Sequence, residues 1–191
     1  MALISPDESI GRVLKNEGWP KVTERISDLG GLTKGGVRFD IYNRWLAAKG
    51  LPPVTRAEFL ELTEVQARAF FWDEFFAPWL FIDDRPIFIL LGDWGVNAGN
   101  DDPAIALQIE FAELGLYPRE KVDGLIGSKT RAAWAAFIGD RDALRDELVR
   151  DRVDFHFGRA YDAKVRAFLK ANPDTQLHNL RGWVSRSLGF I

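Results

Sequence analysis

The sequence SPDESIGRVLKNEGWP occupies residues 5–20, and KVTERISDLGGLTKGGV follows it over residues 21–37. The first stretch begins as helices do, with a polar cap at Ser5, a proline in the first turn and two acids after it. Apolar residues then recur at helical spacing: Ile10, Val13 and Leu14. Gly18 and Pro20 end this run. The second stretch contains four glycines and no helical period, which predicts a loop or a short hairpin.

The rest of the chain predicts a mainly helical protein. Further helices are expected over residues 39–49, 55–74, 86–95, 101–115, 128–137, 140–170 and 175–188. Thr55-Arg-Ala-Glu58 has the pattern of a capping box, which marks the start of the second of these helices. The segment after Pro86 is apolar nearly all round, which predicts a central buried helix.

The composition excludes several classes of protein. A chain of 191 residues, 47% hydrophobic and 28% charged, indicates one globular domain, or one domain with a small appendage. A net charge of −3 argues against the basic surface of a general nucleic-acid binder. The chain has no cysteine, which excludes disulfides, thiolate zinc sites and a cysteine nucleophile. Its two histidines, His156 and His178, are too far apart for a helical metal pair, so we expect neither a metal nor a cofactor.

The location of the protein is predicted from its apolar segments. The first ten residues, MALISPDESI, have neither the basic region nor the apolar region of a signal peptide. The most apolar stretch, residues 82–96, is too short and too charged to span a bilayer. We therefore expect a protein that is made soluble in the cytoplasm and inserts into no membrane. We also expect a monomer.

Glu17 is the leading candidate for a catalytic group. It continues the apolar stripe of the first helix, so it is expected on the buried face at the helix end. Burial raises the pKa of a carboxyl group, and a helix C-terminus acts in the same direction. A general acid at neutral pH needs such a pKa. The structural alternative is a glutamate that bends outward into solvent.

Two polar residues of the glycine-rich stretch complete a possible hydrolase site. Asp28 and Thr33 lie on either side of Gly30-Gly31, where the glycines let the backbone approach a polymer closely. In glycoside hydrolysis one carboxyl protonates the leaving oxygen, while other groups hold water or stabilise positive charge on the sugar. Glu24 is the alternative to Asp28 as the second carboxylate. These residue types are also common in ordinary turns.

Several short motifs resemble those of glycoside hydrolase family 108. That family has an EGG segment followed by DPGGxTxxGI, then DxxVNxG and LQ signatures, a DGxIGxxT element and a terminal GWxxR. The matching pieces are EG at 17–18, DLGGLTKGGV at 28–37, DWGVNAG at 93–99, LQ at 107–108, DGLIGSKT at 123–130 and RGWVSR at 181–186. Their order and spacing together carry the resemblance. Trp19 replaces the second glycine of EGG, and Leu29 replaces the proline.

The resemblance implies a muramidase with a lysozyme-like fold. Glu17 would be the general acid, Asp28 the second carboxylate and Thr33 the hydroxyl that positions water. We expect a lysozyme-like catalytic domain with a small β-hairpin over residues 1–120. A helical region over residues 121–191 is expected to pack on it and to bind peptidoglycan.

Four further residues are candidate substrate contacts: Trp19, Tyr42, Asp93 and Asn97. Trp19 provides either a ring for sugar stacking or an apolar wall beside the acid. Asp93 and Asn97 share one helix face and either contact N-acetyl groups or hold a loop, and Asn97-Ala98-Gly99 is also typical of a helix C-terminus. Tyr42 lines a cleft or packs in the core. Gln108 lies among apolar residues and is expected to bond to backbone rather than to substrate.

The reaction implied is hydrolysis of the β-1,4 bond between N-acetylmuramic acid and N-acetylglucosamine, without a cofactor. The partner is the peptidoglycan glycan strand. Without a signal peptide, the enzyme would reach the wall through holin-type release, as a phage endolysin does, or through dedicated export. Two alternatives stay open: a non-catalytic peptidoglycan-binding or phage structural module, and a lytic transglycosylase that uses Glu17 alone.

Overall fold

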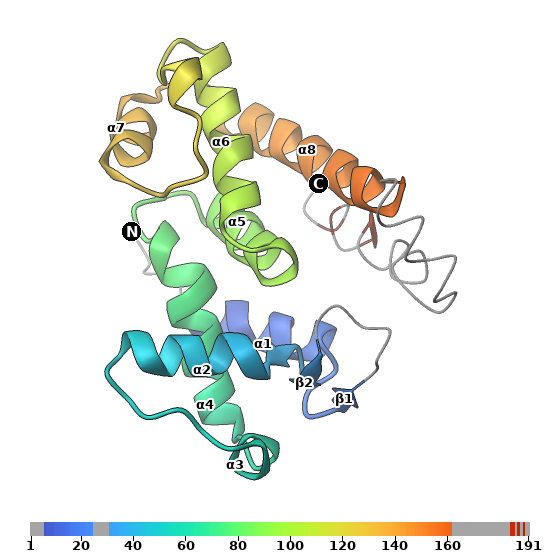
Figure 1. Ribbon diagram of the computed structural model, residues 1–191. Helices are drawn as coiled ribbons and strands as arrows, with labels where there is room; N and C mark the ends of the chain where they lie inside the picture. Colours follow the sequence, from blue (N-terminus) through green and yellow to red (C-terminus); the bar gives the residue numbers. More distant parts are fainter. Residues whose placement is uncertain (1–5, 25–30, 162–183, 186, 188, 190–191) are drawn as a thin grey trace. The chain divides into compact units, whose positions relative to one another are not determined.

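The computed structural model describes residues 6–24, 31–161, 184–185, 187 and 189, and it is mainly helical with one small sheet (Figure 1). The chain divides into two compact units, Met1–Ala77 and Pro78–Ile191. The predicted boundary near residue 120, between a lysozyme-like catalytic domain and a helical peptidoglycan-binding region, stays a prediction.

The first unit contains four helices and a three-stranded sheet in the described residues. The elements are α1 (Pro6–Asn16), β1 (Val22–Glu24), β2 (Leu32–Lys34), β3 (Val37–Arg38), α2 (Phe39–Ala48), α3 (Arg56–Leu60) and α4 (Glu64–Phe71). The strands are antiparallel in the order β1-β2-β3. The apolar stripe of α1 is buried, with Ile10, Val13 and Leu14 at most 4% exposed. The predicted first helix and the hairpin after it are therefore confirmed.

The expected single helix over residues 55–74 is wrong. Thr55 and Glu58 form the predicted capping box at the start of α3, but a second capping box, between Thr63 and Gln66, starts α4 only eight residues later. Each box satisfies the free N–H groups of a new helix start, so the chain restarts instead of continuing. Beyond α4 the helix widens into a π-helix over Trp72–Phe76 and a 3-10 turn over Ala77–Trp79.

The second unit consists of helices in its described part. They are α5 (Arg85–Ala98), α6 (Asp101–Glu113), a 3-10 turn at Arg119–Lys121, α7 (Ser128–Ala136) and α8 (Arg141–Tyr161). Helices α5, α6 and α8 pack against one another. Eight residues of α5 are buried. The buried central helix predicted from the sequence is therefore confirmed. The helix expected over 175–188 lies almost entirely outside the described residues.

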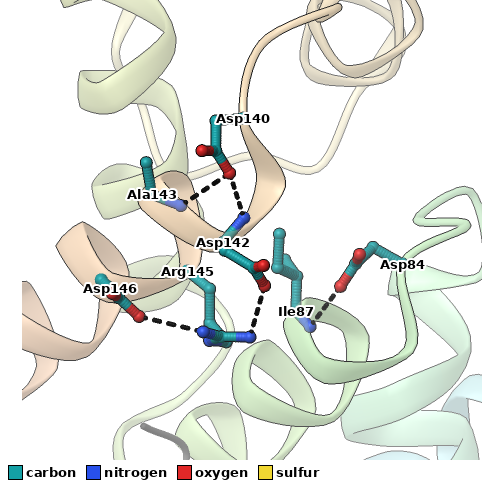
Figure 2. A network of polar contacts seen from close by, with 7 residues as sticks. All are labelled: Asp84, Ile87, Asp140, Asp142, Ala143, Arg145 and Asp146. Carbon is teal, nitrogen blue, oxygen red and sulfur yellow. Dashed lines mark hydrogen bonds and ion pairs between the residues drawn. The ribbon is translucent and has the colours of Figure 1, made fainter.

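Carboxylates cap the starts of two of these helices (Figure 2). Asp84 accepts a hydrogen bond from the Ile87 N–H at 3.0 Å at the start of α5. Asp140 accepts from the N–H groups of Asp142 and Ala143 at the start of α8. Both helices were expected from the sequence, and a carboxylate before the first turn satisfies free N–H groups and complements the helix dipole.

Within the described ranges, none of the helices combines the length and the apolar character that a membrane span requires.

Glu110 on α6 faces an acidic surface of α8. Burial raises the pKa of Glu110, and the charges of Asp151, Glu147 and Glu113 raise it further. The ionised form is therefore less favourable in the folded state, so stability falls as pH rises from the usual glutamate value, about 4.3, through the raised pKa.

Glu110→Gln is expected to stabilise the protein by about 0.5 kcal/mol at pH 7 and to have no effect near pH 3, where both states are protonated. Urea unfolding at the two pH values measures this difference. The exposed Glu120→Gln serves as the control. An equal effect of Glu110→Gln at both pH values would show that packing, and not charge, is responsible.

Candidate active site

Glu17 lies at the C-terminal end of α1. Its N–H donates to the Val13 carbonyl at 2.8 Å, so its backbone still belongs to the last turn. Gly18 then takes a left-handed φ of +71°, and the Trp19 N–H donates to the Leu14 carbonyl at 2.9 Å. This is a Schellman arrangement, for which glycine is the favoured residue. Glu17 is half-buried.

The turn between β2 and β3 packs against Glu17 and Trp19. Gly35 and Gly36 form this two-residue turn with φ of +52° and +81°, which is the geometry of a type I′ hairpin. A Cβ built on Gly36 would lie 2.6 Å from Glu17 Cγ and 2.7 Å from Glu17 Oε2. A Cβ on Gly35 would lie 3.0 Å from Trp19 Cα. The helix end and the hairpin turn therefore meet at the candidate acid.

Thr33 lies on β2, directly opposite Thr23 of β1. The two hydroxyl groups form a hydrogen bond, and the Thr33 hydroxyl also lies 3.4 Å from the Thr23 carbonyl oxygen. If Thr33 donates to Thr23, its own lone pairs are available to accept a hydrogen bond from a water molecule. The arrangement is therefore compatible with a hydroxyl that positions water.

The two candidates for the second carboxylate differ in their surroundings. Asp28 lies outside the described residues. Glu24 is the last residue of β1 and forms an ion pair with Arg56 of α3. Its side chain is 52% exposed, so the arginine and the solvent both compensate its charge. These contacts are typical of a surface ion pair.

Trp19 is half-buried beside the acid. The Lys34 ammonium lies 5.6 Å from the centre of its ring and donates a hydrogen bond to the Leu60 carbonyl of α3. Because successive strand residues point to opposite faces, Lys34 and Thr33 lie on different sides of the hairpin. Lys34 and Gly35 therefore lie against Trp19, and both roles of this residue, sugar stacking and an apolar wall, stay predictions.

Tyr42 lies in the core of the first unit. It is 3% exposed, and its ring packs against those of Trp45, Phe59 and Phe70 with centroids 5.3–5.9 Å apart. Burial raises the pKa of its hydroxyl. The structure thus places Tyr42 among core aromatics, because α2 turns this face toward α3 and α4, and not on a surface that a sugar can reach.

Asp93 and Asn97 belong to α5 in the second unit. Asp93 is 1% exposed and forms an ion pair of 2.7 Å with the fully buried Arg152 of α8. Asn97 donates to the Asp93 carbonyl at 2.8 Å. Of the two roles left open for this pair, these contacts favour the structural one, because the Asp93 carboxylate is inaccessible to an N-acetyl group.

Gln108 organises the DGLIGSKT segment. Its side chain is fully buried, and its amide nitrogen donates to Asp123, the Leu125 carbonyl and Thr130. Its amide oxygen accepts from the N–H groups of Asp123 and Gly124, each at 3.0 Å. The expected backbone bonding is confirmed, and it explains why LQ and DGxIGxxT occur together: one amide side chain holds the whole loop.

Two residues that lie against the candidate residues were not identified from the sequence. Gly36 was included only in the glycine-rich stretch, although two adjacent glycines before a strand are a signal for a tight turn. Arg152 is one of several arginines along α8, and nothing in the local pattern distinguishes it. Its pairing with Asp93 depends on how α5 and α8 pack.

The comparisons with known proteins point to a family of glycoside hydrolases. The family described as Glycosyl hydrolase 108 matches residues 10–99. The matched segment contains the catalytic and substrate-contact candidates proposed from the sequence. The match indicates a glycoside hydrolase, of a kind that acts on peptidoglycan.

A solved structure supports the fold of the chain. The structure of Brucella abortus SagA superposes with a TM-score of 0.66 at 22% sequence identity, covering 97% of this chain and 94% of that chain. The mainly helical, lysozyme-like fold class predicted from the sequence is thereby confirmed. No curated protein sequence matches the chain.

Proposed function

We propose that this protein is a muramidase that hydrolyses the β-1,4 bond between N-acetylmuramic acid and N-acetylglucosamine, with Glu17 as the general acid. The observation that carries the proposal is the position of Glu17 within the segment that matches the glycosyl hydrolase 108 family. It stands half-buried at a helix end, against the tip of a glycine hairpin. A helix end and a packed turn together restrict the carboxyl to few positions, which proton donation to a leaving group requires.

The reaction proceeds by cleavage of the glycosidic C–O bond. Glu17 gives its proton to the leaving oxygen while positive charge develops on the sugar ring. Asp28 supplies the second carboxylate, and the Thr33 hydroxyl, next to that of Thr23, holds the water that attacks the anomeric carbon. The proton of that water passes to the second carboxylate in an inverting reaction. In a retaining reaction the carboxylate itself attacks first, and Glu17 then deprotonates the water.

The remaining expectations complete the proposal. The enzyme acts as a monomer on the cell wall, after holin-type release or dedicated export from the cytoplasm. Residues 121–191, which contain the DGLIGSKT loop held by Gln108, bind the glycan strand.

Product analysis tests the proposed bond and reaction. Purified peptidoglycan is digested with the enzyme, the products are reduced with borohydride and their masses are measured. We expect reducible fragments that end in N-acetylmuramic acid. Fragments that end in reducible N-acetylglucosamine would contradict the bond assignment. Anhydromuramic ends, which borohydride does not reduce, would identify a lytic transglycosylase, and a wall that is bound but not cut would identify a binding module.

A further inference from the structure

We propose that Gly36 is a positioning residue for catalysis: its bare Cα face fixes the Glu17 carboxyl in the place from which it donates its proton. This inference rests on the proposed role of Glu17 as the acid. Gly36 makes no contact with substrate in this proposal and acts only through Glu17.

The contact between Gly36 and Glu17 distinguishes this glycine from others with a similar backbone. Gly18, Gly31 and Gly50 also have positive φ, between +61° and +71°, yet a Cβ on any of them would meet no atom within 4 Å. A Cβ on Gly36 would meet three atoms of Glu17, namely Cβ, Cγ and Oε2, all within 2.8 Å. Conformation alone therefore accounts for those glycines. At position 36 the missing side chain leaves space that the catalytic carboxyl occupies.

The hairpin is held in place on several sides, so it cannot easily retreat from Glu17. The Gly35 N–H donates to the Lys21 carbonyl at 2.8 Å, and Lys34 donates to the Leu60 carbonyl. Val37, the next residue, is fully buried. A methyl group at position 36 would thus push on Glu17. Because Glu17 Cβ is among the atoms that it meets, a side-chain rotation alone does not relieve the contact. The end of α1 would shift together with the Glu17 side chain, and the carboxyl would leave its position.

The consequence for catalysis follows from the distances that proton transfer requires. A general acid must lie within about 2.6–3.2 Å of the atom that it protonates. A misplacement of about 1 Å costs on the order of 100-fold in rate. The Cβ of an alanine at position 36 would lie 2.6–2.8 Å from Glu17 atoms. Moving these atoms to van der Waals separation needs a displacement of about 1 Å. The turn also covers one side of the carboxyl, so a displaced Glu17 would meet more water.

Gly36→Ala, compared with Gly50→Ala, tests the proposal. Both variants place alanine at positive φ, +81° and +70°, but only the first meets Glu17, and Gly50 lies at the exposed end of α2. We expect Gly36→Ala to lower kcat on soluble glycan oligomers about 100-fold, with KM changed less than about threefold. The alkaline limb of its pH–kcat profile should move to lower pH. Gly50→Ala has the same backbone strain without the contact, so it should lose less thermal stability and keep wild-type kcat and pH profile.

The outcomes separate this inference from the proposed function. If Glu17→Gln is inactive while Gly36→Ala keeps kcat and pH profile, the positioning role of Gly36 is wrong and the acid assignment stands. If Glu17→Gln is active, the proposed function fails first. Should Gly36→Ala not fold, nuclear Overhauser contacts between Glu17 Hγ and Gly36 Hα in the wild-type protein decide the point, since their absence overturns the proposal.

Discussion

Glu17→Gln is expected to lower kcat for peptidoglycan hydrolysis by about 10³–10⁴-fold, with little change in KM. Glutamine has nearly the same size and keeps the packing against Gly36, but its amide cannot donate a proton to a leaving oxygen. General acid catalysis contributes rate factors of this order. Loss of turbidity of a wall suspension gives a first measure, and release of reducing ends from soluble oligomers gives kcat and KM.

Glu24→Gln is the matched control for this prediction. Its carboxylate lies in the same glycine-rich region but forms a surface ion pair with Arg56, so its removal should change kcat less than about twofold. If Glu17→Gln clears the wall as well as wild type does, the acid lies elsewhere, with Asp28 and Glu24 the next residues to test. If even the wild type only sediments with the wall, the protein is a binding module.

Asp93→Asn is expected to lower the free energy of unfolding by about 3–5 kcal/mol, because it leaves the guanidinium of Arg152 buried without its carboxylate. In a chain of this size, that loss lowers Tm by about 10 °C or more. Calorimetry measures Tm, and urea unfolding measures the free energy. Turnover measured well below the new Tm should stay close to that of the wild type.

The double variant Asp93→Asn/Arg152→Met separates charge from packing. Removing both charges takes away the buried guanidinium that has lost the Asp93 carboxylate, so the double variant should be more stable than Asp93→Asn alone. A variant Asp93→Asn that keeps its stability and loses affinity for glycan would contradict the ion-pair interpretation and support an N-acetyl contact instead.

Several elements were predictable because their signals are local. The apolar stripe of α1, the capping box at Thr55 and the carboxylate at Asp140 each act within a few residues of themselves. The break before α4 was equally local, since Thr63 and Gln66 form a second capping box. The helix expected from the first capping box ran through this second one. Competition between two helix starts depends on tertiary packing as well as on sequence.

The candidate site was predictable only in part, because local signals identify some of its residues and tertiary packing places the others. Glu17 was found from its place on a helical stripe, and a stripe is a property of sequence. Tyr42 and Asp93 were ambiguous, because an aromatic or an acid on an apolar face has the same pattern whether it faces a cleft or the core. Burial to 3% and 1% favours a place in the core for both residues.

The sequence by itself determined the helical class, the glycine hairpin, the family motifs and the candidate acid, since each of these depends on neighbours along the chain. Only the tertiary structure decided which side chains meet. Gly36 lies 19 residues beyond Glu17, and Arg152 pairs with an acid 59 residues before it. Contacts at such separations arise when helices and turns pack to bury apolar surface, and no local pattern records which partners that packing selects.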